Sequence, residues 1–183
     1  MKTLFRFGFA ALCLCGVVAS QAADTQPYFG VKAGLMMPDA SGFDDAFNIG
    51  GVVGVPVTEL RRDSSGIAGT ISVEGELTLT LVEGDVNINV PPFGNFSGDW
   101  DVWTLGGFGV YRSPASNNLY FKGKLGLVHS DVDVSVAGSS ASGSDTELAI
   151  GFGLGYKLGG RSNLEFEFTL LDDLDFLSVA YHF

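Results

Sequence analysis

Apolar and polar residues alternate with a period of two along several segments of the chain. Residues 69–81 show the pattern most clearly. Their odd positions are apolar or glycine, as at Ile71 and Leu77, and their even positions are polar, as at Glu74 and Thr78. Successive side chains of a β-strand point to opposite faces. The segment is therefore predicted to be a strand with one apolar and one polar face.

The same alternation recurs along the chain and predicts eight strands in all. It is clear near 28–36, 121–127, 147–157 and 164–170. Two further segments, 47–57 and 100–111, carry apolar residues on both faces, so the pattern does not assign their sides. The eighth strand closes the chain with an apolar row of alternate residues: Leu177, Val179, Tyr181 and Phe183.

The connections between these strands differ in length at the two ends of the predicted sheet. One end receives the segments 37–46, 82–99, 130–145 and 171–175, and the other receives 58–66, 112–118 and 159–163. Long loops at one end and short turns at the other are typical of bacterial outer-membrane barrels. We therefore expect an all-β, eight-stranded antiparallel up-and-down transmembrane β-barrel with the longer connections outside the cell.

The first 22 residues have the composition of a secretory signal peptide. Lys2 and Arg6 precede an apolar run over 7–18, and small residues follow at Ser20 and Ala22. We predict cleavage of residues 1–22 and a barrel domain over 23–183. Both cysteines lie inside the leader, so the mature chain is expected to have no disulfide.

Acidic residues gather in the longer connections. The chain has 21 Asp and Glu against 10 Lys and Arg, for a net charge of −11. The four long connections hold acids and no bases: Asp39, Asp44, Asp45, Glu83, Asp85, Asp99, Asp101, Asp131, Asp133, Asp145, Asp172, Asp173 and Asp175. This face is either a solvated, non-adhesive surface or one that attracts divalent cations or cationic partners. The spacing matches no defined calcium loop, so no metal site is predicted.

Nine charged residues fall on the polar faces of the strands and would line the lumen. A barrel of about eight strands is only wide enough for side chains to fill it, and buried charges must be paired. We predict a plugged polar lumen, with a narrow ion channel as the alternative. The predicted network comprises Lys32, Glu74, Glu76, Lys122, Lys124, Glu147, Lys157, Glu165 and Glu167.

No arrangement of residues indicates catalysis or cofactor binding. His129 and Ser130 are adjacent, so a strand sends them to opposite faces, and His182 is expected to point inward. The glycines at 151, 153 and 155 lie within a strand and open no helix, unlike a nucleotide-binding loop. We predict a non-enzymatic protein with no catalytic residue, cofactor or metal, and keep a lipid-modifying hydrolase as an alternative.

A secreted soluble ligand-binding barrel would show the same alternation, with its apolar face turned inward. Loop asymmetry, low charge content, tyrosines near strand ends and the terminal aromatic row favour the membrane. Segments 28–34 and 120–126 and the row ending at Phe183 resemble the small outer-membrane barrel family that includes the outer membrane protein A-like transmembrane barrel and adhesin-like relatives.

That resemblance implies a monomer in the cell outer membrane with a structural or adhesin-like surface role. It also implies contact with outer-membrane lipid and lipopolysaccharide and no nucleic-acid partner. The barrel assembly machinery would recognise the last strand through Leu177, Val179, Tyr181 and Phe183.

Overall fold

The computed structural model describes residues 26–60, 67–92 and 94–183, which form nine β-strands. The predicted signal peptide lies outside the described residues. No helix among the described residues is long and apolar enough to cross a membrane. The strands are β1 (Tyr28–Pro38), β2 (Ala46–Leu60), β3 (Gly69–Val82), β4 (Gly84–Val90), β5 (Gly94–Arg112), β6 (Leu119–Val136), β7 (Ser139–Gly159), β8 (Ser162–Leu170) and β9 (Leu174–His182).

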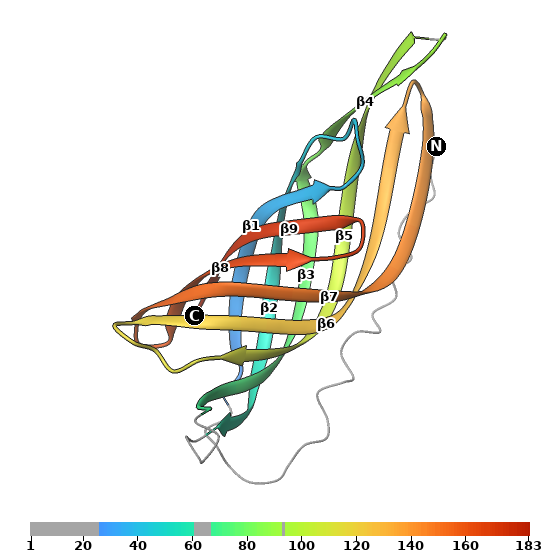
Figure 1. The fold of residues 1–183 in the computed structure, drawn as a ribbon. Helices are drawn as coiled ribbons and strands as arrows, with labels where there is room; N and C mark the ends of the chain where they lie inside the picture. The colour runs from blue at the N-terminus through green and yellow to red at the C-terminus, as the bar shows by residue number, and fades with distance from the viewer. Residues whose placement is uncertain (1–25, 61–66, 93) are drawn as a thin grey trace.

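Eight of these strands close into an antiparallel barrel (Figure 1). Each of the eight pairs with its neighbours in chain order, β3 pairs with β5, and β1 pairs with β9 from Gly30 opposite His182 to Pro38 opposite Leu174. The predicted fold class is confirmed, and the pairing of the first and last strands closes the ring. β4 lies outside the ring: it follows β3 after Glu83 and pairs with the far half of β5.

The two ends of the barrel differ. The turn end carries the β2–β3, β5–β6 and β7–β8 connections and Phe183, whereas the loop end carries all the others. At the loop end, the β4–β5 and β6–β7 hairpins extend well past the remaining strands (Figure 1). The prediction that 82–99 and 130–145 are loops is therefore wrong. Ala137 and Gly138, with φ of 51° and 83°, form a tight turn that lets β6 and β7 continue pairing.

An apolar belt covers the outside of the barrel. Large hydrophobic side chains on the outer face remain 38–59% exposed, which would be unfavourable in water over so wide a patch. A lipid environment accounts for it, because a closed barrel leaves no backbone group unpaired in the hydrocarbon region. The belt comprises Phe29, Val31, Leu35, Ile49, Val53, Val73, Leu77, Leu79, Leu105, Leu125, Leu127, Leu148, Ile150, Phe152, Leu154, Phe166, Leu177 and Val179.

The structure assigns the sides of the two strands whose pattern was ambiguous. On β2, Ile49 and Val53 face outward while Val52 is buried inside. On β5, Leu105 faces outward and Phe108 and Val110 are buried in the lumen. Apolar residues occupy both faces of these strands because the lumen itself contains apolar packing.

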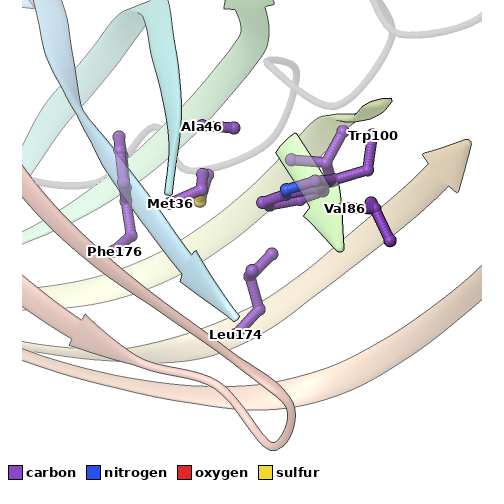
Figure 2. Close-up of a cluster of buried hydrophobic side chains, with 7 residues drawn as sticks. Met36, Ala46, Val86, Trp100, Leu174 and Phe176 are labelled. Atoms are coloured by element: carbon purple, nitrogen blue, oxygen red, sulfur yellow. The ribbon is translucent and has the colours of Figure 1, made fainter. Parts of the chain in front are cut away.

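Phe108 and Val110 belong to a cluster with Val128 and Ala149, beside Lys124. A larger hydrophobic cluster lies at the loop end, inside the barrel mouth and under the projecting hairpins. Trp100 is its largest member, 2% exposed, and its indole Nε1 donates a hydrogen bond of 2.8 Å to the carbonyl of Asp44. Figure 2 shows the side chains of this cluster, which come from β1, β2, β4, β5 and β9, gathered in this region. We call it the loop-end cluster: Met36, Ala46, Val86, Trp100, Val102, Leu174 and Phe176.

Candidate functional site: an ionic network across the lumen

Below the loop-end cluster, the lumen is filled by charged side chains in mutual contact. Glu74 and Glu76 come from β3, and Glu165 and Glu167 come from β8. Lys32 comes from β1, Lys122 and Lys124 from β6, and Arg112 from the end of β5. All four carboxylates and the three lysines are at most 6% exposed. We call these eight residues the lumen network.

Strand order explains why these charges meet. Around the ring, β3 and β8 lie on opposite walls, and β1 and β6 lie on the other two opposite walls, midway between them. Acids therefore face acids and bases face bases across the lumen, with each base between two acidic walls. Apart from Arg112 at the end of β5, the four strands between them contribute smaller or uncharged residues to this part of the interior, which leaves room for the long charged chains to reach the axis.

Lys32 and Lys124 bridge the two acidic walls near the middle of the barrel. Lys32 Nζ lies 2.8 Å from Glu76 Oε2 and 2.8 Å from Glu167 Oε2. Lys124 Nζ lies 2.8 Å from Glu76 Oε1 and 3.1 Å from Glu167 Oε2. Each carboxylate thus contacts cations on both sides, which offsets the large cost of removing these charges from water.

Lys122 and Arg112 form the next layer toward the turn end. Lys122 Nζ lies 3.0 Å from Glu74, 2.9 Å from Glu165 and 2.6 Å from Glu167. Arg112 pairs with both Glu74 and Glu165. The described network is balanced, with four acids and four bases, so no net charge is left buried at its centre.

Two tyrosines and a histidine complete this layer. Tyr28 donates a hydrogen bond of 2.6 Å to Glu74 Oε1, and Tyr120 donates one of 2.6 Å to Glu165 Oε1. His182 Nε2 lies 3.0 Å from Glu165 Oε2 and the ring is 1% exposed. His182 points inward, as the alternation predicted.

Glycines on the inner face of β7 make space for the long side chains. A Cβ at Gly151 would lie 2.6 Å from Lys124 Cε, and a Cβ at Gly155 would collide with the ring of Tyr120. These glycines are therefore needed for packing rather than for binding a nucleotide. Their alternation with Ile150, Phe152 and Leu154 places the aliphatic and aromatic chains in the lipid belt.

Of the nine charged residues predicted to line the lumen, the structure brings seven together. Glu147 stands apart near the loop end, where its carboxylate accepts a hydrogen bond of 2.6 Å from the amide of Asp172. Lys157 continues the inward row of β7 but lies exposed at the turn end. Among the described residues, neither forms a salt bridge with a member of the network.

Sequence reasoning did not place Arg112 in this network. The Ser113-Pro114 pair that follows it predicts a turn over 112–118, whereas Arg112 is the last residue of β5 and its guanidinium reaches back into the lumen. Arg112 lies on the same face of β5 as Phe108 and Val110, so the alternation would have placed it in the lumen. The sequence alone did not show which face of this strand points inward.

Among the residues that the structure describes, one group could hold a metal ion: Glu74, Glu165 and His182, whose ligand atoms lie within 4.8 Å of one another. Arg112 and Lys122 contact the same two carboxylates. A divalent cation here would bring two positive charges next to two existing ones. The chemistry of this donor set therefore fits an ion-pair network and not a metal centre.

A lipid-facing belt around a closed, polar lumen defines the class of membrane-spanning β-barrels. The chain belongs to the family of the outer membrane protein β-barrel domain, whose profile matches residues 7–181. It is accordingly a protein of the cell outer membrane. No curated protein matches the sequence.

Solved structures with the same fold include Neisserial surface protein A, at 12% identity and a TM-score of 0.58, covering 85% of this chain and 95% of that one. The attachment invasion locus protein Ail of Yersinia pestis is 19% identical, with a TM-score of 0.45 and coverages of 86% and 96%. The N-terminal barrel of Pseudomonas aeruginosa OprF is 17% identical, with a TM-score of 0.46 and coverages of 87% and 99%. The first of these similarities supports the fold alone.

Proposed function

We propose that this barrel is a non-enzymatic surface-interaction protein whose loop end faces the cell exterior and contacts cationic partners. The observation that carries the proposal is the sheet formed by β4 and the far halves of β5, β6 and β7, which projects beyond the apolar belt. Bacterial barrels keep their short turns in the periplasm, so this projecting sheet would stand outside the cell.

The projecting sheet packs against the loop-end cluster on one face and carries acidic residues on the other. Its inner face packs through Val132, Val134 and Val136 onto the loop-end cluster. Its outer face carries Asp101 directly opposite Asp133 across the strand pair. Like charges in that position are destabilising, and a cationic partner would relieve the repulsion. We call the outward acids of this sheet the acidic row: Asp99, Asp101, Asp131 and Asp133.

The acidic row can be tested with the purified barrel in nanodiscs of uncharged-headgroup lipid, passed over an immobilised oligolysine peptide. We expect the wild type to bind and the variant D99N/D101N/D131N/D133N to lose most of that binding. The matched control D39N/D172N/D173N/D175N removes the same charge from other loop-end positions. If both variants lose binding equally, net charge and not the sheet is responsible, and the proposal fails.

The lumen network supports a plug in place of a pore. Its ion pairs connect strands on all sides of the ring, and the loop-end cluster covers it from the other side. We propose that the barrel conducts no ions at rest. Recordings of purified protein in planar bilayers should stay flat; regular, reproducible current steps would favour the alternative of a narrow channel.

A hydrolase finds no support in the described residues. His129 contacts Thr146 Oγ1 at 2.9 Å on the outer face, while Ser130 is buried on the inner face. No carboxylate among the described side chains orients His129 by a hydrogen bond.

The remaining partners follow from the outer surface. The belt would contact outer-membrane lipid and, in the outer leaflet, lipopolysaccharide. We propose that the barrel is monomeric, because lipid alone can cover the belt. The row Leu177, Val179, Tyr181 and Phe183 is 38–56% exposed on the outside of β9. This exposure supports its recognition by the barrel assembly machinery before β9 closes against β1.

A further inference from the structure

The turn end of the lumen contains a cavity that the network leaves unfilled. Its volume is about 370 Å³, which is within the usual range for small-molecule sites of about 300–1,000 Å³. The cavity opens at the mouth of the barrel and is separated from the middle of the lumen by the layer of Arg112, Tyr28 and Tyr120. It is a separate feature from the projecting sheet, which lies at the opposite end.

Positive groups line this cavity, and they differ in whether they already have partners. The Arg112 guanidinium is fully engaged: Nε and Nη2 bind Glu165, Nη2 also binds Glu74, and Nη1 donates to Tyr28. Lys157 and Arg161 also line the cavity. Within the part of the chain that the structure describes, neither has a carboxylate within salt-bridge distance.

The placement of these two cations follows from the strand pattern. Lys157 is the next inward residue of β7 after Gly151, Gly153 and Gly155, and it pairs across to Asn163 of β8. Arg161 lies in the tight connection between β7 and β8, next to Gly160, whose φ is 59°. One short hairpin therefore brings both cations and the Asn163 amide to the same rim of the cavity.

The chemistry of the lining selects one kind of ligand. Hydroxyl and amide groups from Ser72, Ser113 and Asn163 line the cavity together with Lys157 and Arg161, beside apolar side chains such as Pro56 and Phe183. A wholly apolar molecule would leave these polar groups unsatisfied, whereas an anion can contact Lys157 and Arg161 together. A phosphate group carries up to two negative charges and several acceptor oxygens, and Arg and Lys are the side chains that bind it most often.

We propose that the turn-end cavity binds a phosphate group, with Lys157 and Arg161 as its charged ligands. The phosphate can belong to a small polar molecule in the periplasm or to a lipid head group at the inner rim of the membrane. Both sources offer the same chemistry to the site, so the test must separate them.

The test follows backbone amide resonances of isotope-labelled barrel in phosphate-free maltoside micelles during titration with inorganic phosphate at constant ionic strength. We expect saturable shifts at Ser113, Arg161 and Asn163. K157Q/R161Q should weaken the apparent affinity at least roughly tenfold, because it removes both charge-assisted contacts. K157R/R161K, which keeps both charges, should retain binding.

S140D/S142D makes the same change in net charge at the loop end and should bind phosphate as the wild type does. Repeating the titration with glycerol 3-phosphate in phosphatidylglycerol nanodiscs identifies the source. If resonances at the mouth still respond, the site takes soluble phosphates; if they already sit at their bound positions, the lipid head group occupies it. Shifts that do not saturate, or that persist unchanged in K157Q/R161Q, or that weaken equally in S140D/S142D, would overturn the proposal.

Discussion

The lumen is filled in two different ways along its length. From the middle toward the turn end, eight charged side chains hold one another in place beside the smaller apolar cluster of Phe108 and Val110, and each charge depends on partners from other walls of the barrel. In the half toward the loop end, apolar side chains such as Trp100, Val102 and Phe176 fill the same space. Charges need specific partners, whereas apolar packing needs volume, so the two halves should respond differently to substitution.

The largest effect is expected where one carboxylate serves three lysines. Glu167 contacts Lys32, Lys122 and Lys124. E167Q would remove one negatively charged partner from each of these three buried lysines. We expect a loss of about 3–5 kcal/mol in the free energy of unfolding, measured by urea titration in lipid vesicles. E147Q is the same substitution at a glutamate outside the network, and it should change the free energy of unfolding little. A loss below 1 kcal/mol for E167Q would show that the network is not a linked set.

A smaller effect is expected from the loop-end cluster. W100F keeps an aromatic ring but removes the indole that donates to Asp44. The lost hydrogen bond and the reduced volume should cost about 1–2 kcal/mol. The change should appear first as faster amide hydrogen exchange in the β4–β5 and β6–β7 hairpins, with protection in the belt strands unchanged. Equal loss of protection in both regions would contradict a locally packed cluster.

The smallest effect concerns the acidic row, which lies on the projecting sheet beyond the apolar belt. Partial burial, together with Asp133 and Asp131 nearby, raises the pKa of Asp101 above its ordinary value of 3.8. A raised pKa means that the folded state binds the proton more tightly, so stability rises as pH falls through the range just above 3.8.

D101N should therefore weaken that pH dependence and slightly stabilise the projecting hairpins at neutral pH. Hairpin amide exchange measured in wild type and D101N at several pH values checks this expectation. A variant whose profile matches the wild type at every pH would contradict it. D45N, at a loop-end acid away from this strand pair, is the control.

The contrast between the two halves also explains what the sequence could predict. The alternation at 69–81 and 164–170 identifies the inner and outer faces of β3 and β8, because their inner face is charged and their outer face faces lipid. Strand β5 gave no such signal, since Val102, Phe108 and Val110 fill the lumen with apolar groups on the face expected to be polar. Arg112 was missed for the same reason.

The alternation alone also could not predict how far the projecting sheet extends. Segments 82–99 and 130–145 are rich in Asp, Ser and Gly, as loops are, yet Val132, Val134 and Val136 continue the inward row of β6. Strand pairing across the Ala137-Gly138 turn and the packing of these valines on the loop-end cluster extend the sheet here. The cavity at the turn end likewise depends on where the network stops, which no local pattern reveals.

The central claim is that the lumen charges form one linked set, and a double-mutant cycle between Glu76 and Lys124 tests it most directly. The two side chains are 2.8 Å apart, and the double variant E76Q/K124Q keeps the buried network neutral. We predict that the double variant unfolds with a loss smaller than the sum of the two single losses, with a coupling of about 1–3 kcal/mol. Strictly additive losses would contradict the account.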